Sequence, residues 1–149
     1  MLTIADAQAA EGNAGDTCAA AQSLANALIQ CGRSAEAWPC YQQAVDSAAD
    51  DSARTAIHLD WARAAISAGA PADAARQCAA ARKIASGAEL VSVWQTEGQV
   101  AQSTGSYARA ARCYRAAIDL LPADSPDLGN LYADLTVTLI RMEDREGAM

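Results

Sequence analysis

Three glycines, Gly32, Gly69 and Gly105, stand 37 and then 36 residues apart, and the residues that follow them share one pattern. Side chains of similar kind recur at fixed distances after each glycine: Ala37, Ala74 and Ala110 at five positions, Tyr41, Cys78 and Tyr114 at nine, and Ala44, Ala81 and Ala117 at twelve. A period in this range, with small residues at fixed offsets, is typical of chains built from a repeated pair of helices. The sequence therefore predicts an all-α solenoid of antiparallel helix pairs.

Alanine dominates the stretches between the glycines, and short segments rich in Gly, Ser and Pro separate them. Alanine is the best helix former, and no long run of β-branched residues favours a strand. We expect helices over residues 18–31, 35–48, 52–68, 72–85, 90–104, 107–121 and 127–142. Glycine suits the left-handed residue that ends a helix. Ser34 and Ser106 are placed to cap the helices that follow, and Pro71 suits a first helical turn.

The chain divides into a lead segment and a repeat domain. We expect residues 1–17 to hold a short helix over 3–11 and a flexible linker over 12–15, which lacks the Lys and the Ser or Thr of a phosphate-binding loop. The repeat domain covers the rest, with repeats at about 18–51, 55–88 and 91–124 and a partial fourth at 129–149. In the fourth repeat Glu143 falls at the turn, and the second helix is missing. Either the natural protein continues or this end docks a partner; we favour continuation.

The charge of the chain argues against several kinds of partner. The formal net charge is −7, and the 11 Lys and Arg residues are scattered along the sequence, which disfavours nucleic acid and anionic membrane surfaces. No apolar run approaches the roughly 18 residues that a transmembrane helix needs. The first residues lack the basic and apolar regions of a signal peptide. We therefore predict a cytoplasmic protein, unless the chain was cut from a longer precursor.

The cysteines show neither a metal-binding nor a disulfide pattern. They are odd in number, none form a CxxC pair, and no histidine cluster accompanies them: Cys18, Cys31, Cys40, Cys78 and Cys113. We expect reduced, inert side chains that behave as small hydrophobic residues. Cys78 should be the most buried, because it stands where the other repeats have a tyrosine. No metal or other cofactor is expected.

No arrangement of residues indicates catalysis. The single histidine, His58, occupies a packing position of its repeat, and no cysteine is expected within hydrogen-bond reach of it. The acidic pairs at 50–51 and 143–144 fall at predicted turns, where solvated charge is the ordinary state. We therefore predict that the chain is not an enzyme.

The third repeat carries the residues of a known family. Its aromatic, small and proline residues stand where a 34-residue consensus has them: Trp94, Gly98, Tyr107, Ala110, Tyr114, Ala117 and Pro122. It departs from that consensus at Glu97 and Ala101. The chain thus resembles the tetratricopeptide repeat family, and the part after Pro122 is similar to kinesin-light-chain-type repeats. This resemblance implies a right-handed superhelix in which Trp94, Tyr107, Tyr114 and Ala110 are mostly buried.

The resemblance also implies a binding groove. In the family the first helix of each repeat lines a concave surface, and this places there Gln22, Asn26, Gln30, Arg63, Gln95, Gln99 and Gln102, together with Asp60, Ser92 and Asp134. Amides both donate and accept hydrogen bonds, which suits an extended peptide. Arg63 is the only basic residue of the central groove, so a clamp for a terminal carboxylate is not expected. The alternative, that these amides merely solvate a helix face, stays open.

Two classes of function follow from this interpretation. The first is an interaction scaffold or regulatory domain of a larger bacterial-type protein, which binds a peptide segment of its partner in the groove. The second is a free-standing chaperone of secretion substrates, similar to type III secretion chaperones. The length of the chain favours the chaperone, whereas the incomplete fourth repeat and the polar groove favour the scaffold, which we predict. Exposed helical ends also favour self-association.

Overall fold

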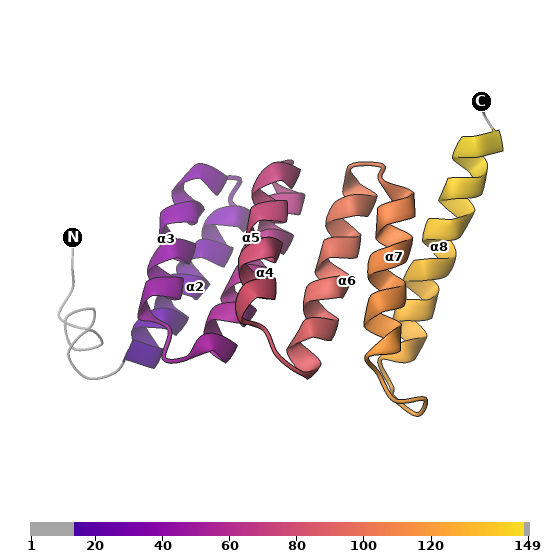
Figure 1. The fold of residues 1–149 in the computed structure, drawn as a ribbon. Helices are drawn as coiled ribbons and strands as arrows, with labels where there is room; N and C mark the ends of the chain where they lie inside the picture. The colour runs from indigo at the N-terminus through magenta and orange to yellow at the C-terminus, as the bar shows by residue number, and fades with distance from the viewer. Residues whose placement is uncertain (1–13, 148–149) are drawn as a thin grey trace.

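The computed structural model describes residues 14–147. They form α2 (Ala14–Gln30), α3 (Ser34–Ser47), α4 (Asp51–Ser67), α5 (Pro71–Ile84), α6 (Ala88–Ser103), α7 (Tyr107–Asp119) and α8 (Leu128–Gly147). Figure 1 shows the helix pairs following one another from α2 and α3 at one end to α8 at the other. The described part of the chain contains no strand. The helix expected over 3–11 lies outside the described residues.

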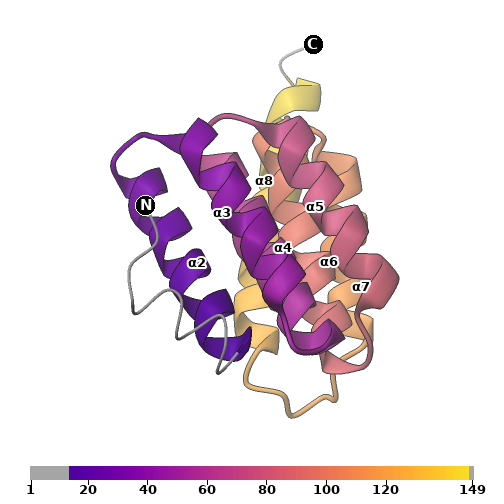
Figure 2. The same ribbon diagram turned by 90° about the vertical axis from the view of Figure 1, so that its left-hand side faces the viewer.

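The helices form two layers. α2 pairs with α3, α4 with α5 and α6 with α7, while α8 packs against α7. Two views at right angles place α3, α5 and α7 along one side and α2, α4, α6 and α8 along the other (Figures 1 and 2). We call these sides the second-helix face and the first-helix face. The predicted all-α solenoid of helix pairs is confirmed.

Three first helices end in the same glycine turn. The φ angles of Gly32, Gly69 and Gly105 are +75°, +76° and +78°. The residue after each glycine donates its N–H to a carbonyl five residues back, as Arg33 does to Leu28 at 2.8 Å. Together with the hydrogen bond of the glycine N–H, this is the Schellman motif that closes a helix.

The turn predicted at Glu143 is wrong, because α8 runs through this position to Gly147. Glu143 stands where the other first helices have glycine, and a residue with a side chain disfavours the left-handed conformation that the turn needs. The helix therefore continues. The guanidinium of Arg145, two residues further along, donates to the carbonyl of Gly105.

The starts of the second helices differ in part from the prediction. Pro71 occupies the first turn of α5, as expected. No side-chain hydrogen bond caps α3, where Ser34 is the first residue, or α7, where Ser106 is the N-cap. The backbone of Ser106, at φ −85° and ψ 65°, is not extended, whereas Asp50 before α4, at φ −152° and ψ 175°, is. The extended geometry lets Asp50 accept from the Ala53 N–H at 2.8 Å.

The predicted core positions are confirmed where the repeat pattern is strongest. Ala110, Tyr41 and Tyr114 are fully buried, and Cys78, at 1% exposed, is the most buried cysteine. Tyr107 and Trp94 are half-buried. The indole of Trp94 lies under the guanidinium of Arg82, whose carbon is 5.6 Å from the ring centroid.

An aromatic stack fills the space between the first two helix pairs. The ring of Trp61 lies 5.7 Å from that of Tyr41 and 6.4 Å from those of Trp38 and His58. The Nδ1 atom of His58 is also 2.8 Å from the amide oxygen of Gln77. His58 is half-buried in this stack, so its predicted packing role is confirmed.

Candidate functional site

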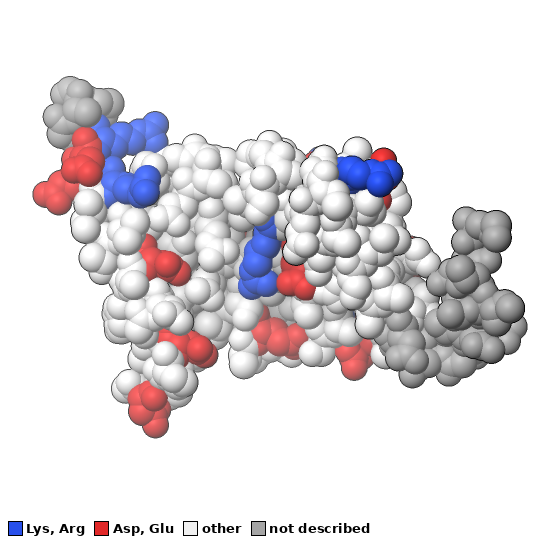
Figure 3. Space-filling model, turned by 180° about the vertical axis from the view of Figure 1, so that it is seen from behind, with Lys and Arg blue, Asp and Glu red and all other residues white. Residues whose placement is uncertain are grey.

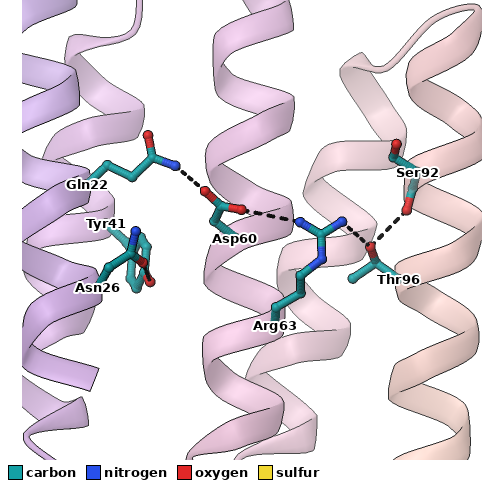
Figure 4. A network of polar contacts seen from close by, with 7 residues as sticks. All are labelled: Gln22, Asn26, Tyr41, Asp60, Arg63, Ser92 and Thr96. Carbon is teal, nitrogen blue, oxygen red and sulfur yellow. Dashed lines mark hydrogen bonds and ion pairs between the residues drawn. The ribbon is translucent and has the colours of Figure 1, made fainter. Parts of the chain in front are cut away.

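Polar side chains are connected from helix to helix across the first-helix face (Figure 4). The amide of Gln22 in α2 donates to the carboxylate of Asp60 in α4. Asp60 also accepts from Arg63 at 3.2 Å, and the other Nη of Arg63 donates to the hydroxyl of Thr96 in α6 at 3.3 Å. The Thr96 hydroxyl donates to the Ser92 carbonyl at 2.8 Å. We call Gln22, Asp60, Arg63 and Thr96 the cross-helix network.

A similar contact reaches the last helix. Gln95 in α6 donates to the carboxylate of Asp134 in α8 at 3.4 Å. Gln22 and Gln95 hold the same place in their repeats, ten residues before the turn glycine, and Asp60 and Asp134 hold the next place along. A glutamine of one first helix thus contacts the aspartate of the following first helix in two places. The register of the repeat therefore sets these contacts.

Two further amides are oriented by buried tyrosines. The hydroxyl of Tyr41 donates to Asn26 Oδ1 at 2.5 Å, and that of Tyr114 donates to Gln102 Oε1 at 3.0 Å. Burial, assisted by the nearby charge of Asp60, raises the pKa of Tyr41 to about 12. Burial likewise raises the pKa of Tyr114. Both phenols therefore stay protonated donors at neutral pH, and each engages an amide oxygen while the NH₂ group of that amide makes no hydrogen bond within residues 14–147.

A hollow of about 290 Å³ lies beside the cross-helix network, between α4 and α6. The charged residues that line it are Asp60, Arg63 and Glu89, and Thr55, Leu59 and Ser92 supply much of the rest. Figure 3 shows the first-helix face as largely uncharged surface with separate acidic side chains and a basic one near its middle. This face therefore offers hydrogen-bonding groups and a slight excess of acid.

The residues predicted for the groove all lie on first helices, but they have different surroundings. Gln22 and Arg63 belong to the cross-helix network, and Gln95 contacts α8. Gln30 is exposed near the end of α2, and Gln99 is half-buried on α6. Within residues 14–147 neither of these two makes a side-chain hydrogen bond. The structure thus brings Gln22 and Arg63 together through Asp60.

Sequence reasoning missed the part that Thr96 plays. Thr96 is fully buried, and its hydroxyl oxygen accepts a hydrogen bond from the guanidinium of Arg63. It stands nine residues before its turn glycine, the same place as Asp60. This shared position in the repeat could have identified Thr96 as a polar residue that contacts the neighbouring first helix.

The structure also corrects the prediction that the basic residues are scattered. Six of the 11 lie on two second helices, α5 and α7: Arg76, Arg82, Lys83, Arg109, Arg112 and Arg115. The same helices hold only two acidic residues, Asp73 and Asp119. The second-helix face therefore carries a local positive charge on an acidic chain.

The described residues contain neither a metal site nor a membrane-spanning helix. No group of three His, Cys, Asp or Glu side chains within 14–147 is arranged to hold a metal ion. No helix in that range combines the length and the apolar character needed to cross a membrane.

The fold and this face define a class: a helical-repeat solenoid with a polar side that no other helix of the described chain covers. A family model described as tetratricopeptide repeat matches residues 19–51 and 91–124. These segments coincide, to within one residue, with the first and third predicted repeats, and both are similar to tetratricopeptide repeats. Repeats of this family generally mediate protein–protein interactions. Neither the curated proteins nor the solved structures gave a match. The likeness of the C-terminal part to kinesin-light-chain-type repeats stays a prediction.

Proposed function

We propose that this chain is a protein-interaction domain that binds an extended segment of its partner along the first-helix face. The observation that supports this most is the cross-helix network, in which Gln22, Asp60, Arg63 and Thr96 connect three successive helices. An extended peptide presents a backbone N–H and a carbonyl at each residue, and polar groups repeated from helix to helix suit such a ligand.

The chemistry of the face favours a neutral or weakly basic segment. Arg63 already pairs with Asp60, so a partner carboxylate would have to compete with that acid for the guanidinium. A guanidinium has five N–H groups, and the network uses two of them, which leaves donors for a backbone carbonyl. Asp60 and Glu89 beside it favour a basic side chain in the hollow. Each neutral hydrogen bond contributes about 0.5–1.5 kcal/mol, so binding depends on several of them.

The experiment compares two arginines on opposite faces. A peptide is selected from a random displayed library against the intact chain, and its Kd is measured for the parent, for Arg63→Glu and for Arg76→Glu. The two positions match, because each arginine is on the solvent side of a helix and pairs with an aspartate three residues earlier. Only Arg63 lies on the first-helix face.

We expect Arg63→Glu to raise the Kd about tenfold or more, since a charge-assisted hydrogen bond is lost, and Arg76→Glu to leave it unchanged. Circular dichroism checks that both variants fold. If Arg76→Glu weakens binding and Arg63→Glu does not, the partner uses the second-helix face and the proposal is wrong.

A further inference from the structure

Successive second helices leave a space between them, and large side chains fill that space where α3 faces α5. Trp38 of α3 and Trp61 of α4 stack there, with ring centroids 6.4 Å apart and planes 27° apart. Trp61 is only 9% exposed. Trp38 also packs against the cluster that contains Ala74 and Cys78 of α5. Two indole rings therefore fill the space between α3 and α5, which we call the first slot.

One repeat later the same two positions hold a small residue and a charged one. Ala75 stands where the first repeat has Trp38, six residues after the turn glycine, and Glu97 stands where the second has Trp61, eight residues before it. A cavity of about 370 Å³ lies in this second slot, between α5 and α7. Its apolar lining includes Ala75, Ala79 and Val100. The volume falls in the range of small-molecule sites.

The charged groups of the slot leave an excess of positive charge. Glu97 is 7% exposed and accepts from Arg82 at 3.1 Å. Burial raises the pKa of Glu97, against the opposing effects of Arg82 and Arg109. Arg109, on the α7 wall, makes no ion pair within residues 14–147, and it lines both this cavity and an adjoining one of about 290 Å³ that also includes Arg112. The cavity is thus lined by one carboxylate and two guanidinium groups, with that of Arg112 in the adjoining cavity, and this excess of positive charge suits an anion.

We propose that the cavity between α5 and α7 binds a compact aromatic carboxylate. Its ring would take the space that the indoles of Trp38 and Trp61 fill one repeat earlier, against Ala75 and Val100. Its carboxylate would pair with Arg109, whose planar guanidinium can bind both carboxylate oxygens. This site lies on the second-helix face, so it stands or falls independently of the peptide site.

The test is isothermal titration of the full chain with three probes: benzoate, phenylacetate and indole-3-acetate. Tryptamine, which joins the same indole ring to a positive charge, is the charge control. We expect saturable one-site binding of at least one carboxylate and none of tryptamine. If none of the three carboxylates binds saturably, or if tryptamine binds as tightly as indole-3-acetate, the proposal is overturned.

Three variants test the location. Ala75→Trp places an indole where Trp38 stands one repeat earlier and should abolish binding in a folded protein. Arg109→Gln should raise the Kd about tenfold or more, because a charge-assisted contact is lost. Arg76→Gln, on α5 but outside the cavity, is the matched control and should leave the Kd unchanged. Unaltered binding to Ala75→Trp or to Arg109→Gln overturns the proposal, and Arg109→Gln decides alone if Ala75→Trp fails to fold.

Discussion

Gly98 lies against the ring of Tyr114, and this contact sets the spacing of α6 and α7. A Cβ atom on Gly98 would stand 2.6 Å from Cε1 and 2.8 Å from Cζ of Tyr114. Carbon atoms in ordinary contact are about 3.5–4.0 Å apart, so the substitution Gly98→Ala requires a movement of roughly 1 Å. The ring has little freedom to move, because Tyr114 is fully buried and its hydroxyl is bonded to Gln102.

Two effects oppose each other in the Gly98→Ala protein. Alanine stabilises a helix interior by about 1 kcal/mol relative to glycine, whereas overpacking a core costs about 1–3 kcal/mol. Three ring atoms, Cε1, Cζ and Cδ1, are too close and none belongs to a flexible chain end, so we take the upper half of that range. The net expectation is a loss of about 1–2 kcal/mol in the free energy of unfolding, measured by urea titration with circular dichroism.

The first repeat tolerates alanine at the equivalent place because its tyrosine is oriented differently. Ala25 stands there, seven residues before its turn glycine. The hydroxyl of Tyr41 bonds to Asn26, the very next residue, whereas that of Tyr114 bonds to Gln102, four residues beyond Gly98. The Tyr114 ring therefore passes against the backbone at Gly98 on its way to Gln102.

Two controls make the result decisive. Gly129→Ala in α8 should be neutral or stabilising by up to about 1 kcal/mol, since no atom lies within 4 Å of its Cβ position. In a Tyr114→Leu background the ring is gone, so Gly98→Ala should change sign and stabilise. A Gly98→Ala protein as stable as the parent, or one destabilised equally in both backgrounds, would show that the Tyr114 ring does not restrict this position.

Three other expectations concern the core. Cys78, whose pKa is raised by burial to about 12, should react with a thiol reagent far more slowly than exposed Cys31, and equal labelling rates would contradict its position. Burial raises the pKa of Glu97 above its ordinary 4.5, so the folded state binds its proton more readily than the unfolded chain does. The unfolding free energy of the parent protein should therefore rise, relative to that of the Glu97→Gln protein, as the pH falls through the raised pKa toward 4.5. A difference between the two proteins that stays constant with pH would show that the pKa of Glu97 is not raised. Ala110→Leu should lower the unfolding free energy by about 1–3 kcal/mol, because Ala110 is fully buried between α6 and α7; an unchanged denaturation midpoint would argue against that packing.

The helix pairs could be predicted because a few residue types have no alternative role at their positions. Gly32, Gly69 and Gly105 adopt a conformation that other residues avoid, so they mark the turns. Ala37, Ala74 and Ala110 allow the close approach of paired helices, and all three are completely buried. Where Glu143 replaces the glycine, the same rule indicates that the helix continues. Matching this position to the repeat pattern led instead to the prediction of a turn.

The partners of the polar residues could not be predicted in the same way. Gln22 and Asp60 lie on different first helices, and only the packing of successive pairs brings them together. The cavity beside Arg109 depends on what is missing, since Ala75 and Glu97 leave open a space that Trp38 and Trp61 fill elsewhere. Both features follow from the repeat register once the contacts between neighbouring repeats are known.

Photocrosslinking tests most directly whether the first-helix face binds the partner. A photoreactive phenylalanine derivative replaces Gln99 of α6 in one variant and exposed Arg115 of α7 in another, and each protein is irradiated with the peptide selected against the intact chain. We predict a crosslink from position 99 and none from position 115, because only position 99 lies on the first-helix face. A crosslink from position 115 alone would contradict it.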